Sequence, residues 1–141
     1  MTSFNKAFVT ALVVVCATGL ALALEARSRA TGVVKGEQLL VADLAGEPGK
    51  EVDMQVYTFP PGASVAWHIH PDAHEFDYEI DGTLTLNYEG QESKALKRGE
   101  AVYVPPNVVH RGVNLSRTQP ARVVVVRVKP KDQPLTTEVN P

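Results

Sequence analysis

GASVAWHIHPDAHEFDYEIDG (residues 62–82) and GEAVYVPPNVVHRGVN (residues 99–114) are the two segments that decide the fold of this chain. The chain has four histidines, and all of them lie in these two segments. Clustering of this kind is unusual in a chain so poor in histidine. Three of the four have spacings that suit a shared metal ion, namely His68, His70 and His110.

Short apolar or alternating segments surround this cluster, and Gly, Pro, Asn and Asp separate them. Turn signals every 8–12 residues or so are typical of a β-sandwich or a closed β-barrel. Beyond the N-terminal segment, no stretch has a sustained helical period. The sequence therefore predicts an all-β fold, with strands over residues 38–44, 52–59, 65–70, 76–80, 83–88, 93–96, 101–104, 110–114 and 122–129.

The spacing of the histidines predicts how they could meet. Residues two apart in a strand point to the same side, so His68 and His70 would enter a barrel about 7 Å apart along the chain. The chain turns at Pro71 and returns with Glu75, while His110 arrives from a distant strand. Three imidazoles and one carboxylate suit Fe, Mn, Ni, Cu or Zn better than Ca or Mg. In an octahedral ion, this ligand set leaves two positions open for water, oxygen or substrate.

The two segments resemble the two motifs of the cupin superfamily. Residues 62–82 fit G-x5-H-x-H-x(3,4)-E-x6-G, and residues 99–114 fit G-x5-P-x-G-x2-H-x3-N. The one departure is Asn107 in a glycine position, where we expect a positive φ that Asn tolerates. The resemblance implies a small single-domain (type 2) cupin with a jelly-roll β-barrel and one divalent transition metal. Fe or Mn is favoured, with Ni, Cu or Zn as alternatives, and the implied ligands are His68, His70, Glu75 and His110.

The N-terminal segment is typical of a secretory signal peptide. Lys6 precedes an uncharged apolar run over residues 8–24, and residues 21–23 (ALA) form a small-x-small cleavage site. An uncleaved membrane anchor is the alternative, because the run is close to the length of a short spanning helix. We expect a periplasmic or secreted protein. The predicted organisation is a signal peptide or anchor (1–23), a linker (24–37), a cupin β-barrel (38–130) and a polar tail (131–141), either loose or strapped over a neighbouring subunit.

Composition excludes some classes of partner. The net charge of −2 gives no basic footprint for nucleic acid. Cys16, the single cysteine, lies in the predicted signal peptide, so the mature chain would form no internal disulfide. We expect a small-molecule substrate, contact with membrane only through an uncleaved signal, and a homodimer that uses the apolar residues 123–126.

The acidic segment around Glu75 gives less definite expectations. Alternation would place Glu75, Asp77 and Glu79 on one face, where three carboxylates would be costly to bury. We therefore expect either a bulge or a position beyond the cavity for Asp77 and Glu79, and we favour an exposed or interface position for Glu79. His74 should point away from the metal, as a rim residue or as a proton shuttle. Tyr103 is a further candidate base.

Other side chains have default assignments. Arginines are expected at the surface or at an interface, unless one faces inward to hold an anionic substrate. These arginines are Arg111, Arg122 and Arg127. Aromatic residues are expected in the core or in the wall of a pocket. They are Phe59, Trp67, Phe76, Tyr78, Tyr88 and Tyr103.

Three functions remain open, because a fold does not fix a chemistry. The favoured one is a dioxygenase-like enzyme that acts on a chelating organic substrate such as a phenol, flavonol or diketone. The second is a metal-assisted isomerase or lyase of a small metabolite, and the third is a non-catalytic module that binds a small ligand or metal. For an enzyme, Glu75 is the first catalytic candidate, followed by His74 and Tyr103.

Overall fold

The computed structural model describes residues 32–141, and this part of the chain contains ten β-strands and no helix. The strands form two five-stranded antiparallel sheets. Sheet A has the order β1-β2-β9-β4-β7, with bounds Lys35–Asp43, Lys50–Phe59, Ala121–Pro130, His74–Asp81 and Ala101–Val104. Sheet B has the order β10-β3-β8-β5-β6, with bounds Thr137–Glu138, His68–Ile69, His110–Val113, Thr83–Tyr88 and Lys94–Lys97.

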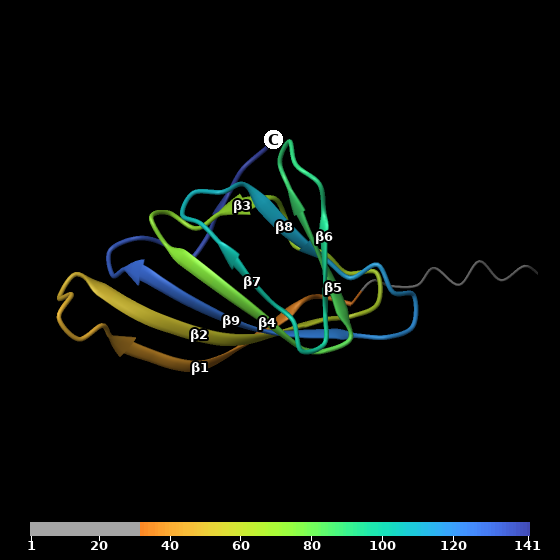
Figure 1. Ribbon diagram of the computed structural model, residues 1–141, viewed down its shortest axis with the longest axis horizontal. Coiled ribbons are helices and arrows are strands. Elements are labelled where there is room, and N and C mark those ends of the chain that lie inside the picture. The colour runs from red at the N-terminus through yellow and green to blue at the C-terminus, as the bar shows by residue number, and fades with distance from the viewer. Residues whose placement is uncertain (1–31) are drawn as a thin grey trace, which may run out of the picture.

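The two sheets face each other, as Figure 1 shows, and the apolar core lies between them. This arrangement confirms the predicted all-β jelly roll. The core lies mainly between the inner faces of β9 and β5, and it consists of Phe59, Leu84, Leu86, Leu96, Ala121, Val123 and Val125. Strand β9 contributes side chains to both faces of sheet A. Every second residue from Ala121 to Lys129 is buried, and the residues between them face outward.

Two turns have backbone requirements that the sequence meets. Asn107 has φ of 62°, which confirms the positive φ expected in the glycine position of the second motif. Its side chain also holds the turn after β3, because the Asn107 Oδ1 accepts from the Asp72 amide at 3.1 Å. Gly82 has φ of 81°, and a Cβ there would lie 2.3 Å from the carbonyl oxygen of Pro120. Only glycine fits at that position without displacing the backbone.

The two ends of the barrel differ from the predicted boundaries. Strand β1 begins at Lys35, three residues before the predicted strand at residue 38. The tail is not loose, because β10 pairs with β3 of its own barrel. The predicted signal peptide and most of the predicted linker lie outside the described residues. Within residues 32–141, no helix is long and apolar enough to cross a membrane.

Three aromatic residues predicted for the core or a pocket wall lie on the outer face of sheet A instead. Phe76, Tyr78 and Tyr103 are 45–48% exposed. For Phe76 and Tyr78 the reason is the two-residue period of β4, which points Glu75 and Asp77 inward and turns the residues between and after them outward. Tyr103 on β7 lies directly opposite Phe76 and therefore shares its face. Phe59 is buried in the core, as expected.

Candidate metal centre

Three imidazoles from two distant segments of the chain converge between β3 and β8. His68 on β3 lies directly opposite His110 on β8, and His70 follows β3. The distance between ring centroids is 4.5 Å for His68 and His110, 4.8 Å for His68 and His70, and 5.2 Å for His70 and His110. One ring nitrogen from each residue lies within 4.8 Å of the other two. The structure thus brings together the three histidines that the spacing singled out.

Each of these imidazoles makes a hydrogen bond from Nδ1 to a backbone carbonyl. A carbonyl oxygen can only accept, so Nδ1 carries the proton and Nε2 keeps a free lone pair. This is the tautomer that binds a metal through Nε2. The partners and distances are Ala66 for His68 at 2.8 Å, Leu135 for His70 at 2.6 Å and Val108 for His110 at 2.9 Å.

Glu75 places its carboxylate between two of these lone pairs. Its Oε2 lies 2.7 Å from Nε2 of His70, and its Oε1 lies 3.2 Å from Nε2 of His110. The Nε2 of His70 is buried without a hydrogen-bond partner. Unprotonated nitrogens that face a carboxylate at such distances repel it, and a cation shared between them removes the repulsion. The donor set therefore fits a divalent transition metal.

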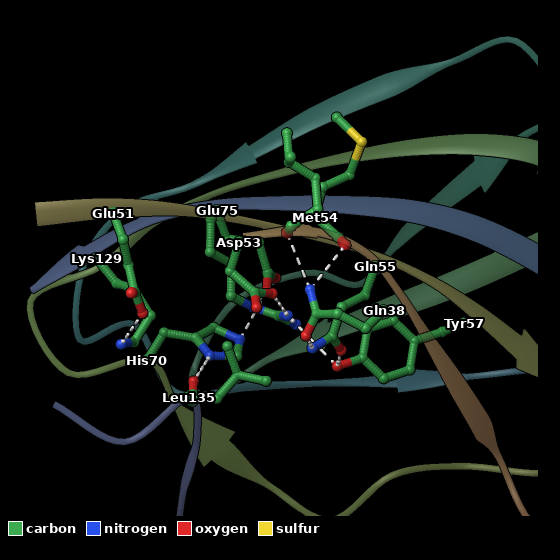
Figure 2. Close-up of polar contacts among 12 residues, drawn as sticks. Gln38, Glu51, Asp53, Met54, Gln55, Tyr57, His70, Glu75, Lys129 and Leu135 are labelled. Carbon is green, nitrogen blue, oxygen red and sulfur yellow. Dashed lines mark hydrogen bonds and ion pairs between the residues drawn. The ribbon is translucent and has the colours of Figure 1, made fainter. Parts of the chain in front are cut away.

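Arg127 on β9 contacts the same carboxylate, at the oxygen that faces His70. Its Nε donates to Oε2 of Glu75 at 2.7 Å, and its side chain is buried (Figure 2 shows the surrounding contacts). Burial by itself would raise the pKa of Glu75. The charge of Arg127 opposes burial and lowers the pKa of Glu75, without requiring a proton on Nε2 of His110 or His70. Glu75 is therefore an anion at neutral pH.

His68 is also in the form that a metal requires. Burial lowers the pKa of this imidazole to about 4, with further lowering by the neighbouring His110 and His70. At neutral pH the ring is uncharged, and its Nε2 lone pair is available to an ion.

A cavity of about 600 Å³ lies next to the histidines. Its lining includes polar side chains of the site, namely His68, His110, Glu75, Asp77 and Arg127. It also includes apolar side chains of the core, namely Phe59, Leu84, Leu86, Val123 and Val125. The cavity can thus take a ligand that has a polar group and an apolar body.

The two acids that follow Glu75 are both buried, so simple alternation holds along this part of β4. Asp77 lines the cavity, contrary to the expectation that it would lie beyond it. Burial and then the adjacent Glu75 raise its pKa well above the usual range. Glu79 does lie beyond the cavity lining, but the favoured exposed position was wrong, because its side chain is fully buried. The amide of Arg122 donates to its Oε1 at 3.0 Å, which partly satisfies the buried acid.

Glu79 should make stability depend on pH. Burial raises the pKa of Glu79 to about 7, so the folded state keeps a proton that the unfolded chain loses near pH 4.5. The stability that this proton contributes should be fully present below about pH 4.5, and it should be lost as the pH rises toward 7. The variant Glu79→Gln stays neutral and keeps an acceptor for the Arg122 amide. We expect it to exceed the parent by on the order of 2 kcal/mol at pH 8 and by much less near pH 5.

Urea unfolding at the two pH values measures this difference. The matched control is Glu92→Gln, an exposed site that should change stability little at either pH. A difference between Glu79→Gln and the parent that stays constant from pH 5 to pH 8 would contradict the buried-acid explanation.

His74 and Tyr103 lie away from this centre. Both are on the outer face of sheet A, joined by a 2.7 Å hydrogen bond between Nδ1 and the phenol oxygen. Neither lines the cavity. His74 is an exposed rim residue, in line with the first of the two interpretations from the sequence. The two-residue period of β4 points His74 away from Glu75. Neither His74 nor Tyr103 therefore lies where it could act at the candidate metal centre.

Two groups at the site were missed from the sequence. Arg127 was assigned to the surface by default, yet it is buried against Glu75. Its place in the alternating run with Val123 and Val125 was the signal that it faces inward. The second group is the carbonyl of Leu135, in the tail. A backbone acceptor has no signature in the sequence, so no pattern could have found it.

Comparison with known proteins gives a family and several relatives. A family model described as a cupin domain matches residues 55–127. Oxalate oxidase GF-2.8 of Triticum aestivum is 28% identical over 109 residues, which cover 70% of this chain and 49% of the wheat protein. The tetracenomycin polyketide synthase protein TcmJ of Streptomyces glaucescens is 41% identical over 64 residues, which cover 45% and 42% of the two chains. This chain spans about half the length of these relatives.

A solved structure with the same fold comes from Klebsiella pneumoniae. It is a conserved protein with a double-stranded beta-helix domain, and it superposes with a TM-score of 0.63 at 21% identity. The match covers 78% of this chain and 87% of the other. At this identity, the likeness concerns the fold alone.

Proposed function

This chain belongs to the cupin family, and from that membership and its site we propose that it is a metal-dependent oxidoreductase with dioxygenase-like activity. In this proposal, His68, His70, His110 and Glu75 hold one divalent transition metal, with Fe or Mn favoured. The single observation that carries it is the convergence of three Nδ1-protonated imidazoles beside a buried carboxylate, with His68, His110 and Glu75 in the wall of a cavity. A purely structural metal site has little use for such an adjoining space.

A bound metal would supply a Lewis-acidic centre that polarises an oxygen atom of a substrate, and His68, His70, His110 and Glu75 would hold it. The residues of the chain orient the ligands and set the polarity around them. Arg127 holds Oε2 of Glu75, so Oε1 remains directed toward His110. Burial of His70, Glu75 and His110 limits access of water to these side chains, which strengthens electrostatic interactions among them.

The cavity indicates the class of substrate. A ligand pocket of this volume suits a molecule with at least one ring, and the apolar residues of its lining suit an apolar body. Of the two acids in this lining, Asp77 is held toward its neutral form and the charge of Glu75 is matched by Arg127, so the apolar lining is the feature that disfavours a substrate with two negative charges. We therefore propose a chelating phenol, enol or diketone. Oxalate, the substrate in the name of the wheat relative, is the alternative that an assay must test.

The test begins with elemental analysis of protein purified without a histidine tag. The protein is then reloaded with Fe(II) or Mn(II), and oxygen consumption is followed with catechol, 3-hydroxyflavone, acetylacetone and oxalate. We expect bound metal and uptake with at least one of the first three, and little with oxalate. Bound metal without oxygen uptake on any of them would reject the proposal. That result would instead favour a metal-assisted isomerase or lyase. Asp77, which lines the cavity, is compatible with such an enzyme.

A further inference from the structure

We propose that the C-terminal tail (residues 131–141) is part of the metal centre, because the backbone carbonyl of Leu135 is the group that orients the ligand His70. This inference rests on the metal site proposed above, and it adds a positioning group from a segment outside the two sequence motifs. Figure 2 shows the contact, in which the His70 imidazole lies against the Leu135 carbonyl.

The three histidines differ in where their carbonyl partner comes from. For His68 and His110, the partner is two residues earlier on the same segment, so a local backbone conformation sets the tautomer. For His70, the partner lies 65 residues later in the chain. The Nδ1 contact of His70 therefore depends on docking of the tail, whereas the Nδ1 contacts of the other two imidazoles are local.

Backbone contacts hold the tail in place on both sides of Leu135. Before it, the Lys131 amide donates to the Gly49 carbonyl at 3.0 Å. After it, β10 pairs with β3, with Glu138 opposite His68. The Val139 amide then donates to the Trp67 carbonyl at 2.9 Å. These contacts fix the position of the Leu135 carbonyl relative to the His70 ring, and they complete the edge of sheet B.

Loss of the tail should change the tautomer of His70 but not that of the other two imidazoles. Without an acceptor at Nδ1, the proton of His70 distributes between the two ring nitrogens, and a fraction of the molecules then carries the proton on the metal-binding Nε2. Removing a partner of this kind typically costs 10–100-fold in metal affinity. We expect a loss of this size on removal of residues 131–141, together with a change in the tautomer of His70 but not of His68 or His110.

The experiment measures both quantities on the full chain and on a chain that ends at Pro130. Co(II) affinity is determined by competition with a chelator, and the imidazole tautomers of the metal-free protein are determined from ¹⁵N chemical shifts. Circular dichroism and amide chemical-shift dispersion establish that the shortened chain is folded. The expected result is weaker Co(II) binding and an altered ¹⁵N pattern at His70 alone.

A pair of point variants tests the same idea without shortening the chain. Val139→Pro removes the amide that donates to Trp67, and it should shift the His70 tautomer and weaken Co(II) binding in the same direction as truncation. Val139→Ala keeps the amide and should leave both unchanged. If truncation does not permit folding, this pair decides the question.

The outcomes separate this inference from the proposed function. A full chain that binds no Co(II) rejects the metal site, while the ¹⁵N pattern of the metal-free protein still reports whether the tail orients His70. A full chain that binds Co(II), with a folded tail variant that binds equally well and keeps the Nδ1 proton on His70, overturns the inference alone.

Discussion

Replacing His110 by alanine is expected to abolish metal binding at neutral pH. His110 is 2% exposed, and it is the one imidazole of the three that comes from the second motif. Its removal leaves two imidazoles and Glu75, and it also removes the contact to Oε1 of that carboxylate. Since loss of an outer partner alone costs 10–100-fold in affinity, loss of the ligand itself should exceed about 100-fold. Elemental analysis and chelator competition with Co(II) measure the effect.

His74→Ala is the matched control for this prediction. It removes the same side chain from a nearby strand, but from the exposed face, where Nδ1 contacts only the Tyr103 hydroxyl among the described residues. Metal content and affinity should equal those of the parent protein. Full metal content in His110→Ala, or an equal loss in both variants, would show that the ion does not bind among the three converging imidazoles.

Much of the fold and the histidine cluster could be predicted because the sequence carries them as local patterns. A strand repeats its environment every two residues, so the alternation in β4 and β9 shows which residues share a face. The spacing of His68 and His70 reports the same period. Asn107 could be placed in a left-handed conformation because few other residues tolerate it. Each of these inferences needs only a few neighbouring residues.

The remainder of the site depends on contacts that no local pattern encodes. Leu135 acts through its carbonyl, which every residue has, and its partner is 65 residues away. The inward position of Arg127 could be read from alternation, but a default that places arginines at the surface outweighed that signal. Glu79 was misplaced for a related reason. The cost of burying an acid depends on its protonation and its partners, and neither follows from its neighbours in sequence.

Arg127→Met should produce the largest loss of stability in the metal-free protein. Arg127 donates to Glu75 and lies 3.9 Å from Oδ1 of Asp53, and all three side chains are buried. Methionine preserves much of the apolar volume but leaves the buried acids without their cation. Breaking a buried ion pair from one side typically costs about 3–5 kcal/mol. Urea unfolding at pH 7 with a chelator present measures the free energy of unfolding. Arg122→Met, an exposed site on the same strand, should change it little.

The pH and the metal should both modulate this loss, which separates the electrostatic cause from packing. In the parent protein, Arg127 helps to hold the pKa of Glu75 well below its usual range, so the resulting stabilisation is present above the unfolded pKa and is lost as the pH falls. Without Arg127 that stabilisation is absent, so the gap between the two proteins should be widest near pH 7. It should narrow below about pH 4, where Glu75 is protonated in the unfolded chain. A bound divalent cation should narrow the gap as well, because it supplies a positive charge beside Glu75. A gap that is independent of both pH and metal would instead assign the effect of Arg127 to packing.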